Sequence, residues 1–362
     1  MSRDQQHNKK LLIMAAGTGG HIFPGLAIAE IMQARGWIVS WLGTTKGMEV
    51  QIVPKHHIVM DNIDFSGLRG KGLMHTLTGA YQLVASFFTC ARILGRRRPD
   101  VVLGMGGYVT VPGGLMAALL GKPVVLMNAD AALLLSNRVL RPVSRKLLFG
   151  LPSASVHKDS KLVLTGNPIR KDICQLPQPQ DRYSARSGPL KILVVGGSLG
   201  AKALNESIPD ALALIPMAQR PVVTHQSGKQ HAQALRQRYA TVGVEAEVLD
   251  FIDDMPRRYA EADLVICRAG AITVSELTAA GVASILIPFV ASSTSHQKDN
   301  AQWMAQKNAA IYLPQAELNV SKLAAQLQAM TRMQCLEFAQ AAYALGQRDA
   351  SETIAKILED LA

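Results

Sequence analysis

His21 is the side chain whose sequence context best suits proton chemistry. It directly follows Gly17-Thr18-Gly19-Gly20, a glycine-rich run after a short apolar segment. An imidazole in such a turn can take a proton from a hydroxyl nucleophile near neutral pH. A histidine that only caps the next helix or bonds a backbone carbonyl is the structural alternative. That alternative is the default for an isolated histidine, and the glycine run before His21 weakens it.

Two further polar residues could bind a diphosphate. Arg170 ends the segment Asn167-Pro168-Ile169-Arg170, and its guanidinium could make a two-pronged contact with phosphate oxygens. A plain turn with a solvated arginine is the alternative. Ser198 lies in a second glycine-rich run, 196–200, and could add a hydroxyl to the same phosphates.

The segment Cys267–Glu276 has the pattern of a strand end, a turn of small residues and a helix start. Thr273 and Glu276 have the spacing of a capping box, which would give both a structural role. The same helix N-terminus could accept a phosphate, and the carboxylate could hold ribose hydroxyls. Both roles can hold, for different atoms.

A bound metal is not expected, and no cofactor is implied. The sequence contains no Asp-x-Asp pair and no histidine–carboxylate cluster at ligand spacing. Charge on a leaving diphosphate would therefore be stabilised by backbone N–H groups, Arg170 and helix ends.

Parallel α/β units must position these residues. Short apolar runs alternate with helical segments, which is typical of doubly wound folds. Glycine-rich runs at 17–20, 104–107 and 196–200 each follow a predicted strand, so all three should lie at the carboxyl edge of a sheet, where ligands bind. A helix is predicted to open at Pro24 and to end at Gly36. The predicted strands are Leu11–Met14, Ile38–Leu42, Val101–Leu103, Val124–Met127, Lys191–Val195, Val222–His225, Leu264–Cys267 and Ser284–Ile287.

The order of these elements predicts two doubly wound, Rossmann-like domains that face each other across a cleft. We predict an N-terminal domain at 10–169 plus 347–362 and a C-terminal domain at 170–346. The stretch 177–180, with Arg182 and Arg186 close behind, is typical of surface between them. The last segment, 351–362, places four apolar residues on one helical face and could pack back onto the first domain (Ile354, Ile357, Leu358 and Leu361).

Composition narrows the class of protein. The 362 residues are 48% hydrophobic and 18% charged, so each of two domains can bury a core. Four scattered cysteines without a Cys-x-x-Cys pair argue against a disulfide framework or a thiolate zinc site, and fit a reducing cytoplasm. The polar N-terminus and the short apolar runs predict neither a signal peptide nor a membrane span, so we expect a soluble or peripheral protein.

The formal charge of +11 favours an anionic partner. The stretch 65–99 has no acidic residue and surrounds an apolar, aromatic-bearing segment with basic residues. Basic flanks around such a segment favour a membrane surface over nucleic acid. An ordinary core helix with a solvated basic end is an equally strong alternative on the pattern alone.

Several strings, in order, resemble the MurG family of peptidoglycan glycosyltransferases along nearly the whole chain. That family has the two-domain GT-B fold. The matching strings are 17–21, 67–72, 102–108, 166–170, the Gly196 turn, 251–255 and 268–276.

The resemblance implies a role for each matching residue. His21 would be the base for the acceptor's 4-hydroxyl, Arg170 and Ser198 would hold the diphosphate, and Glu276 would bind ribose. Backbone groups at Ile252 would meet uracil. The implied substrate-binding set is Thr18, Gly19, Gly20, Asp130, Arg170, Ser198, Ile252, Ala271, Ile272, Thr273, Val274, Ser275, Glu276 and Gln297, the last on the sugar.

The implied activity is transfer of N-acetylglucosamine from UDP-N-acetylglucosamine to an undecaprenyl-diphosphate-linked muramyl peptide, with inversion and without metal. The implied partners are these two substrates and the anionic lipids of the inner leaflet. Other cell-wall synthesis proteins are further candidate partners, and nucleic acid is not expected. The 73–88 segment would dock on the cytoplasmic face of the bacterial inner membrane, with the protein held peripherally.

The chain departs from the family at one loop and at two other points. Met127-Asn128-Ala129-Asp130 replaces His-Glu-Gln-Asn, Ala16 replaces a glycine, and Thr294-Ser295 replaces residues that are often acidic. Asp130 stands for an asparagine that contacts the donor sugar, and an ionised carboxylate cannot donate a hydrogen bond. Altered specificity, impaired activity and compensation by neighbours remain open. A UDP-sugar-binding scaffold without turnover and a UDP-sugar epimerase on the same fold are the alternative functions.

Overall fold

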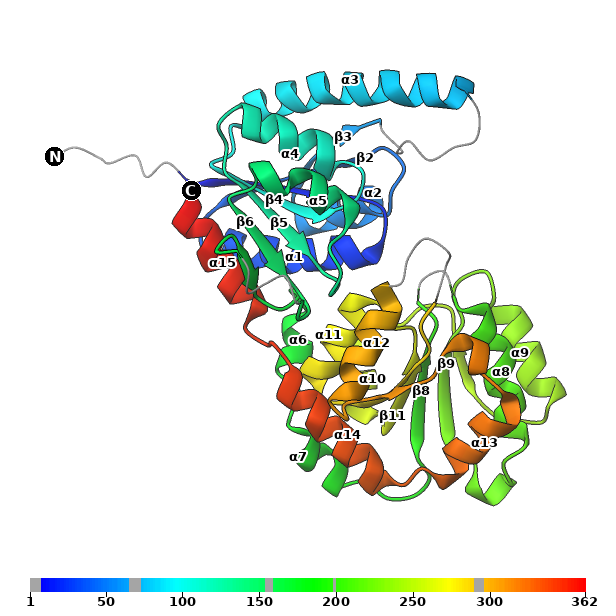
Figure 1. The fold of residues 1–362 in the computed structure, drawn as a ribbon. Coiled ribbons are helices and arrows are strands. Elements are labelled where there is room, and N and C mark those ends of the chain that lie inside the picture. Colours follow the sequence, from blue (N-terminus) through cyan, green and yellow to red (C-terminus); the bar gives the residue numbers. More distant parts are fainter. Residues whose placement is uncertain (1–7, 65–72, 154–158, 198–199, 290–295) are drawn as a thin grey trace. The chain divides into compact units, whose positions relative to one another are not determined.

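The computed structural model describes residues 8–64, 73–153, 159–197, 200–289 and 296–362, with the helical backbone alone for 73–81 (Figure 1). The chain forms two compact units, Met1–Arg170 with Asp349–Ala362, and Lys171–Arg348. The first unit gives way to the second after residue 170 and the second ends at residue 348, one and two residues later in the chain than predicted. Each unit is a doubly wound α/β structure, as the sequence predicts, and each is described by itself.

The N-terminal unit is built on a seven-stranded sheet in the order β3-β2-β1-β4-β5-β6-β7, and all its strand pairs are parallel. The strand order reverses between β1 and β4, which in a doubly wound sheet is where ligands bind. The strands are β1 (Lys10–Ala15), β2 (Ile38–Thr44), β3 (Val59–Ile63), β4 (Val101–Gly106), β5 (Val124–Asn128), β6 (Lys146–Phe149) and β7 (Leu162–Leu164).

Helices cover both faces of this sheet because alternate strand residues point to opposite sides. Leu11 and Ile13 belong to the core under α1 and α15, whereas Leu12 and Met14 belong to the core under α3, α4 and α5. The helices are α1 (Gly19–Ala34), α2 (Glu49–Ile52), η1 (Val53–His56), α3 (Leu73–Arg97), α4 (Thr110–Leu119), α5 (Leu135–Leu140), η2 (Arg141–Val143) and α15 (Ala350–Leu361).

The C-terminal helix α15 packs on α1, so the chain returns to the first unit as predicted. Ile354 and Leu358 are buried in the core that α1 shares. Arg35, at the end of α1, bonds Glu359 at 2.6 Å and also pairs with Glu352. The apolar face and these ion pairs together hold the two ends of the chain in one unit.

The predicted start of α1 at Pro24 is wrong, because the helix begins at Gly19 and Pro24 lies inside it. A proline this close to the start removes only the bond to the Gly20 carbonyl, so the helix tolerates it. The predicted stop is confirmed. Gly36 has φ +82°, and the Gly36 and Trp37 N–H groups donate to the carbonyls of Gln33 and Met32, as in a Schellman motif.

The C-terminal unit has a six-stranded parallel sheet in the order β10-β9-β8-β11-β12-β13, which reverses between β8 and β11. Its strands are β8 (Lys191–Val195), β9 (Val222–Gln226), β10 (Glu247–Leu249), β11 (Leu264–Cys267), β12 (Ala283–Leu286) and β13 (Ile311–Tyr312). Its helices are α6 (Lys171–Cys174), α7 (Pro179–Ser184), α8 (Lys202–Ala213), η4 (Met217–Gln219), α9 (Ala232–Thr241), α10 (Met255–Glu261), α11 (Ala271–Ala280), α12 (His296–Gln306), η5 (Gln315–Glu317), α13 (Val320–Ala329) and α14 (Arg332–Leu345).

The stretch expected to be surface between the domains is instead part of this unit. Arg182 donates to the Tyr259 carbonyl at 3.1 Å and to the Gly281 carbonyl at 2.6 Å. Arg186 pairs with the buried carboxylate of Asp263 at 2.7 Å. Basic side chains here hold α7 against the sheet rather than facing solvent.

Helix α3 combines features of both explanations offered for it. Cys90, Ile93 and Leu94 are buried under the sheet, as in a core helix. Arg97 bonds Asp61 at 2.6 Å, so part of the basic end is structural. Phe88 is 74% exposed. No helix among the described residues has the length and apolarity that crossing a bilayer requires.

Candidate functional site

Two glycine-rich turns meet where β1 and β4 end. A Cβ on Gly107 would lie 2.6 Å from the Ala16 carbonyl oxygen, and one on Gly106 would lie 2.7–2.8 Å from the imidazole of His21. Both glycines also have positive φ, +122° at Gly106 and +88° at Gly107, which side chains rarely adopt. Only glycine at these positions lets the second turn pack directly against the first.

His21 is the third residue of α1, and its ring is half-buried between these turns. Its Nδ1 lies 3.2 Å from the Ala16 carbonyl oxygen. Because a carbonyl oxygen can only accept, Nδ1 carries the proton in the neutral ring and Nε2 carries the lone pair. Among the described residues, the ring makes no other hydrogen bond. Burial lowers the pKa of His21, opposed by the Ala16 bond and the charges of Asp130 and Glu49.

Thr18, Gly19 and Gly20 form the start of α1 beside this histidine. Thr18 is the N-cap residue, yet its side chain makes no capping hydrogen bond. Thr18 and Gly20 are exposed and Gly19 is half-buried. The predicted contact residues of the first turn therefore lie together at the N-terminal, positive end of a helix.

Glu49 is a site residue that the sequence analysis missed. It begins α2 and is fully buried, with one carboxylate oxygen 3.1 Å from the Gly17 N–H donor. The other oxygen accepts from the Thr44 backbone N–H at 2.9 Å and the Thr44 hydroxyl at 2.7 Å. Glu49 belongs to no recognisable motif. The two nearby glycines, Gly43 and Gly47, could have indicated it in the sequence, because they make room for its side chain.

The loop that departs from the family is built around Asn128. Its buried amide donates to the carbonyls of Asp130 and Ala132 at 2.7 and 3.0 Å, and its oxygen accepts from the Leu134 N–H at 2.9 Å. Asn137 donates to the same oxygen at 3.1 Å. The loop 127–130 is therefore ordered by its own hydrogen-bond network. It places Asp130 close enough for its charge to raise the pKa of His21.

Asn167 ties the segment before Arg170 to this loop. It is buried, and its amide donates to the Ala129 carbonyl at 3.0 Å. A Cβ on Gly150 would lie 2.0–2.3 Å from the same amide, so Gly150 is needed for the contact. Arg170 is half-buried and is the last residue of the N-terminal unit's first segment.

The second unit has its glycine turn at the corresponding switch point, after β8 and beside β11. A Cβ on Gly196 would lie 2.9 Å from the Ala201 nitrogen, and one on Gly200 would lie 2.3 Å from the Ser227 carbonyl oxygen. These glycines let the turn pack against the start of α8 and the end of β9. Ser198, predicted to bind the diphosphate, lies outside the described residues.

The predicted capping box on Thr273 and Glu276 is wrong. Helix α11 begins at Ala271, with Gly270 as the N-cap residue in extended conformation and no side-chain capping bond. Thr273 is therefore the third helical residue. The start of α11, formed by Ala271, Ile272 and Thr273, is a helix N-terminus whose N-cap residue, Gly270, supplies no side-chain hydrogen bond.

The remaining predicted donor-site residues lie around the same edge of this sheet. Glu276 is half-buried on α11 and accepts from the Tyr259 hydroxyl at 3.1 Å. Gln297, on α12, accepts from the Phe289 N–H at 2.8 Å. Ile252 is buried in the loop after β10, and Val274 and Ser275 are buried in α11.

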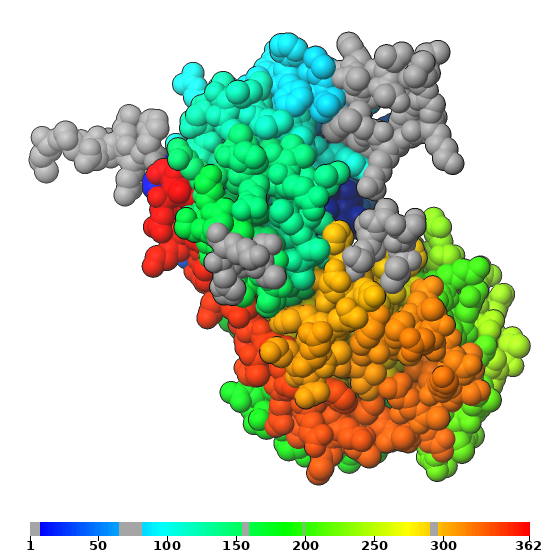
Figure 2. Space-filling model, viewed as in Figure 1, coloured from blue at the N-terminus to red at the C-terminus, as the bar shows by residue number. Residues whose placement is uncertain are grey.

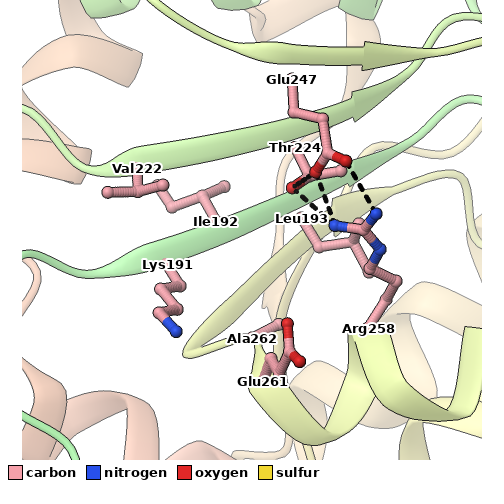
Figure 3. A pocket seen from close by; sticks show the side chains of 9 residues that line it. All are labelled: Lys191, Ile192, Leu193, Val222, Thr224, Glu247, Arg258, Glu261 and Ala262. Atoms are coloured by element: carbon pink, nitrogen blue, oxygen red, sulfur yellow. Dashed lines mark hydrogen bonds and ion pairs between the residues drawn. The ribbon is translucent and has the colours of Figure 1, made fainter.

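A pocket of about 220 Å³ lies at the opposite, amino end of the sheet (Figure 3). Two of its charged residues bond each other: Arg258 donates to Glu247 at 2.6 and 2.8 Å, and the Thr224 hydroxyl donates to Glu247 at 2.8 Å. Strand starts line it, and ligands of doubly wound sheets bind at strand ends. We therefore assign it no role in the site. The lining residues are Lys191, Ile192, Leu193, Val222, Thr224, Glu247, Arg258, Glu261 and Ala262.

In the described part of the chain, no three histidine, cysteine, aspartate or glutamate residues form a group that could hold a metal ion. Three of the four free cysteines are buried, and burial raises the pKa of Cys90, Cys267 and Cys335 to about 12. These thiols are unsuited to nucleophilic chemistry at neutral pH.

Comparison with known proteins matches both units. Residues 11–148 match the N-terminal domain of glycosyltransferase family 28, and residues 191–357 match its C-terminal domain. A Janthinobacterium protein named UDP-N-acetylglucosamine–N-acetylmuramyl-(pentapeptide) pyrophosphoryl-undecaprenol N-acetylglucosamine transferase is 67% identical, over 98% of this chain and 99% of its own. The protein of the same name from Herminiimonas arsenicoxydans is 66% identical over the same shares.

A solved structure agrees with these relatives. The crystal structure of Acinetobacter baumannii MurG is 35% identical to this chain, with a TM-score of 0.82, over 97% of this chain and 99% of that one. The similarity covers both doubly wound units.

Proposed function

The chain belongs to glycosyltransferase family 28, and from that premise we propose that it transfers N-acetylglucosamine from UDP-N-acetylglucosamine to a muramyl acceptor. The acceptor is an undecaprenyl-diphosphate-linked muramyl peptide, attacked through its 4-hydroxyl with inversion at the anomeric carbon. The observation that carries the mechanism is the His21 ring, whose Nδ1 is tied to the Ala16 carbonyl while Nε2 keeps its lone pair.

His21 acts as the general base. Nε2 removes the proton of the acceptor hydroxyl as that oxygen attacks the sugar from the face opposite the diphosphate. The lowered pKa of His21 keeps the imidazole neutral, and so able to accept, at neutral pH. The oxygen–carbon bond to the acceptor forms, the bond to the diphosphate breaks, and UDP leaves with the electron pair.

The second unit binds the donor. The uncapped N-terminus of α11 offers backbone N–H groups and a positive helix end to the diphosphate, and supports the proposal that Ala271 to Thr273 hold phosphate. Arg170 and Ser198 add to the same contacts. Glu276, oriented by the Tyr259 hydroxyl, holds the ribose, while Ile252 meets the uracil through its backbone. The oxygen of Gln297 is bound to a backbone N–H, so its amide nitrogen is the atom to meet a sugar hydroxyl.

The N-terminal unit docks on the cytoplasmic face of the inner membrane as a peripheral protein. Helices α3, α4 and α5 cover one face of its sheet, and each carries exposed apolar residues. Figure 2 shows their cyan and green segments together at the surface of this unit. Exposed arginines 92 and 138 accompany them and suit anionic headgroups. The exposed apolar residues are Val84, Phe88, Leu119, Leu120, Leu135 and Val139.

Replacing His21 with alanine tests the proposal. We expect the rate of sugar transfer to the lipid acceptor to fall by roughly 10²–10⁴-fold, the usual contribution of a general base. UDP binding, measured by calorimetry, should stay near that of the unchanged protein because the His21 side chain makes none of the proposed UDP contacts. Tight UDP binding by the unchanged protein with no transfer would instead favour the scaffold function.

The pH dependence of the unchanged protein gives a second readout. Because the pKa of His21 is lowered, kcat/KM should stay level as pH falls toward 6.5 and decline only below it. The same sign holds for stability. The unfolded histidine binds its proton at higher pH than the folded one, so the stability that neutral His21 contributes is lost as pH falls below about 6.5.

A further inference from the structure

One peptide group lies between the buried carboxylate of Glu49 and the ring of His21. The N–H of the Ala16–Gly17 peptide donates to Glu49 Oε2 at 3.1 Å. The carbonyl oxygen of that same peptide accepts from His21 Nδ1 at 3.2 Å. Carboxylate, peptide and imidazole therefore form one continuous chain of hydrogen bonds that leads to the proposed base.

The environment of Glu49 is unusual for a charged group. It is fully buried, and in the described part of the chain no lysine, arginine or histidine forms an ion pair with it. Within the described residues, its oxygens accept from the backbone N–H groups of Gly17 and Thr44 and from the Thr44 hydroxyl. A buried carboxylate without a cation is costly, so its presence here calls for a role beyond pairing.

The surrounding glycines keep this carboxylate in place. A Cβ on Gly47 would lie 2.0–2.3 Å from the carboxylate atoms of Glu49, and one on Gly43 would lie 2.8 Å from its Cγ. Thr44 ends β2, the neighbour of β1, and its hydroxyl also accepts from the Gly47 N–H at 3.2 Å. The loop is thus shaped around the position from which Glu49 reaches the turn before His21.

We propose that Glu49 is a positioning residue that acts on His21 through the Ala16–Gly17 peptide, fixing the imidazole tautomer and strengthening it as a base. Hydrogen bonds in series polarise one another. A negatively charged carboxylate that accepts from the peptide N–H therefore makes the carbonyl of the same peptide, that of Ala16, a stronger acceptor. In catalytic triads a carboxylate accepts directly from the histidine Nδ1–H and fixes the tautomer in the same way. Here a peptide group is inserted between them.

Two carboxylates act on the His21 ring in the described structure. Glu49 acts from the loop after β2 and Asp130 from the loop after β5, and both charges raise the pKa of His21 against the lowering by burial. Asp130 is on the departing loop, whereas Glu49 alone is joined to Nδ1 by the peptide. The inference rests on the proposed role of His21, and its test therefore includes a measurement that needs no activity.

Glu49→Gln tests the inference in the full chain. Glutamine keeps the shape but lacks the charge, and its NH₂ group must face one of the N–H or O–H donors. We expect the His21 pKa, followed by NMR titration of histidine-labelled protein, to fall by roughly half to one unit. The pH at which kcat/KM begins to decline should fall by the same amount. The plateau value of kcat should fall about tenfold.

Asp61→Asn is the matched control. Asp61 is also a buried carboxylate of this unit, but it pairs with Arg96 and Arg97 on α3. Its replacement should lower the melting temperature and leave the His21 pKa in place. If Glu49→Gln behaves in the same way, with lower stability and an unchanged His21 pKa, Glu49 is only structural and the inference is wrong.

Gly47→Ala serves as a second variant, and decides the matter if Glu49→Gln does not fold. It keeps the charge but displaces the carboxylate from Gly17, so it should lower the His21 pKa by a smaller amount, and an unchanged pKa would overturn the inference. Failure of the proposed function is a separate result. If His21→Ala still transfers sugar, His21 is not the base, whereas the effect of Glu49 on its pKa is measured independently.

Discussion

The carboxyl edges of the two sheets occupy the same topological position and present different chemical groups. In the N-terminal unit, the turn after β1 leads to a side chain, His21, whose Nδ1 bonds the Ala16 carbonyl and whose ring lies against Gly106 of the neighbouring turn. In the C-terminal unit, the strand β11 leads to the uncapped backbone of α11.

The difference shows how one architecture can support two tasks. Proton transfer needs a single nitrogen in a fixed orientation, so the first edge surrounds it with close contacts that only glycine permits. Diphosphate binding needs several donors spread over one helix end, and at the second edge a Cβ added to Gly270 would meet no described atom closer than 3.9 Å. The two edges should therefore respond differently to small substitutions.

The largest effect is expected for Gly106→Ala in the N-terminal unit. Its Cβ would lie 2.7 Å from His21 Cδ2 and 2.8 Å from Nε2, and its φ of +122° is strained for alanine. We expect kcat to fall about 100-fold as the ring is displaced, and the free energy of unfolding to drop by about 1–3 kcal/mol. Steady-state transfer and thermal melts measure the two effects.

Gly121→Ala is the control for this variant. Gly121 also has positive φ, +71°, but an added Cβ would meet no atom of the described residues within 4 Å. It should lose stability through backbone strain and keep its kcat. Equal rates for the two variants would show that contact with the His21 ring is unimportant.

A smaller effect is expected for Gly270→Asp in the C-terminal unit. An aspartate at the N-cap would accept from the first N–H groups of α11 and place a negative charge where the diphosphate binds. We expect an unchanged or slightly higher melting temperature and about tenfold weaker UDP binding by calorimetry.

Two controls accompany the aspartate. Gly270→Ala adds a Cβ without a cap and should bind UDP nearly as well as the unchanged protein. Glu247→Gln alters the paired charges of the pocket at the amino edge and should also leave UDP affinity unchanged. Normal UDP binding by Gly270→Asp would remove the start of α11 from the proposed diphosphate site.

The smallest effect is expected for Asp130→Asn on the loop after β5. An amide can donate to a sugar hydroxyl where the ionised carboxylate cannot, so KM for UDP-N-acetylglucosamine should fall about two- to fivefold. Initial rates at varied donor concentration measure it. An unchanged KM would mean that residue 130 does not contact the sugar. Changing Asn128 as well would be less informative, because its amide holds the loop together.

Local sequence pattern predicted the two central strands of the second sheet well. Lys191–Val195 and Leu264–Cys267 match β8 and β11 at both ends, since buried parallel strands are continuous apolar runs. Helix starts were predicted less well. Pro24 and Thr273 each have the sequence features of a start, yet α1 and α11 begin earlier, at Gly19 and Ala271. Backbone conformation at Thr18 and Gly270 decides those starts, and composition does not encode it uniquely.

The sequence by itself determined the two doubly wound units, the return of the C-terminal helix to the first unit, and His21 as the residue after the first glycine turn. Only the tertiary structure decided what surrounds that residue. Gly106 and Glu49 reach the turn from distant points of the chain, because parallel strands that are far apart in sequence end side by side. The link between Glu49 and His21 passes through a backbone peptide. Every residue carries such a group, so no pattern of residue types could reveal the link.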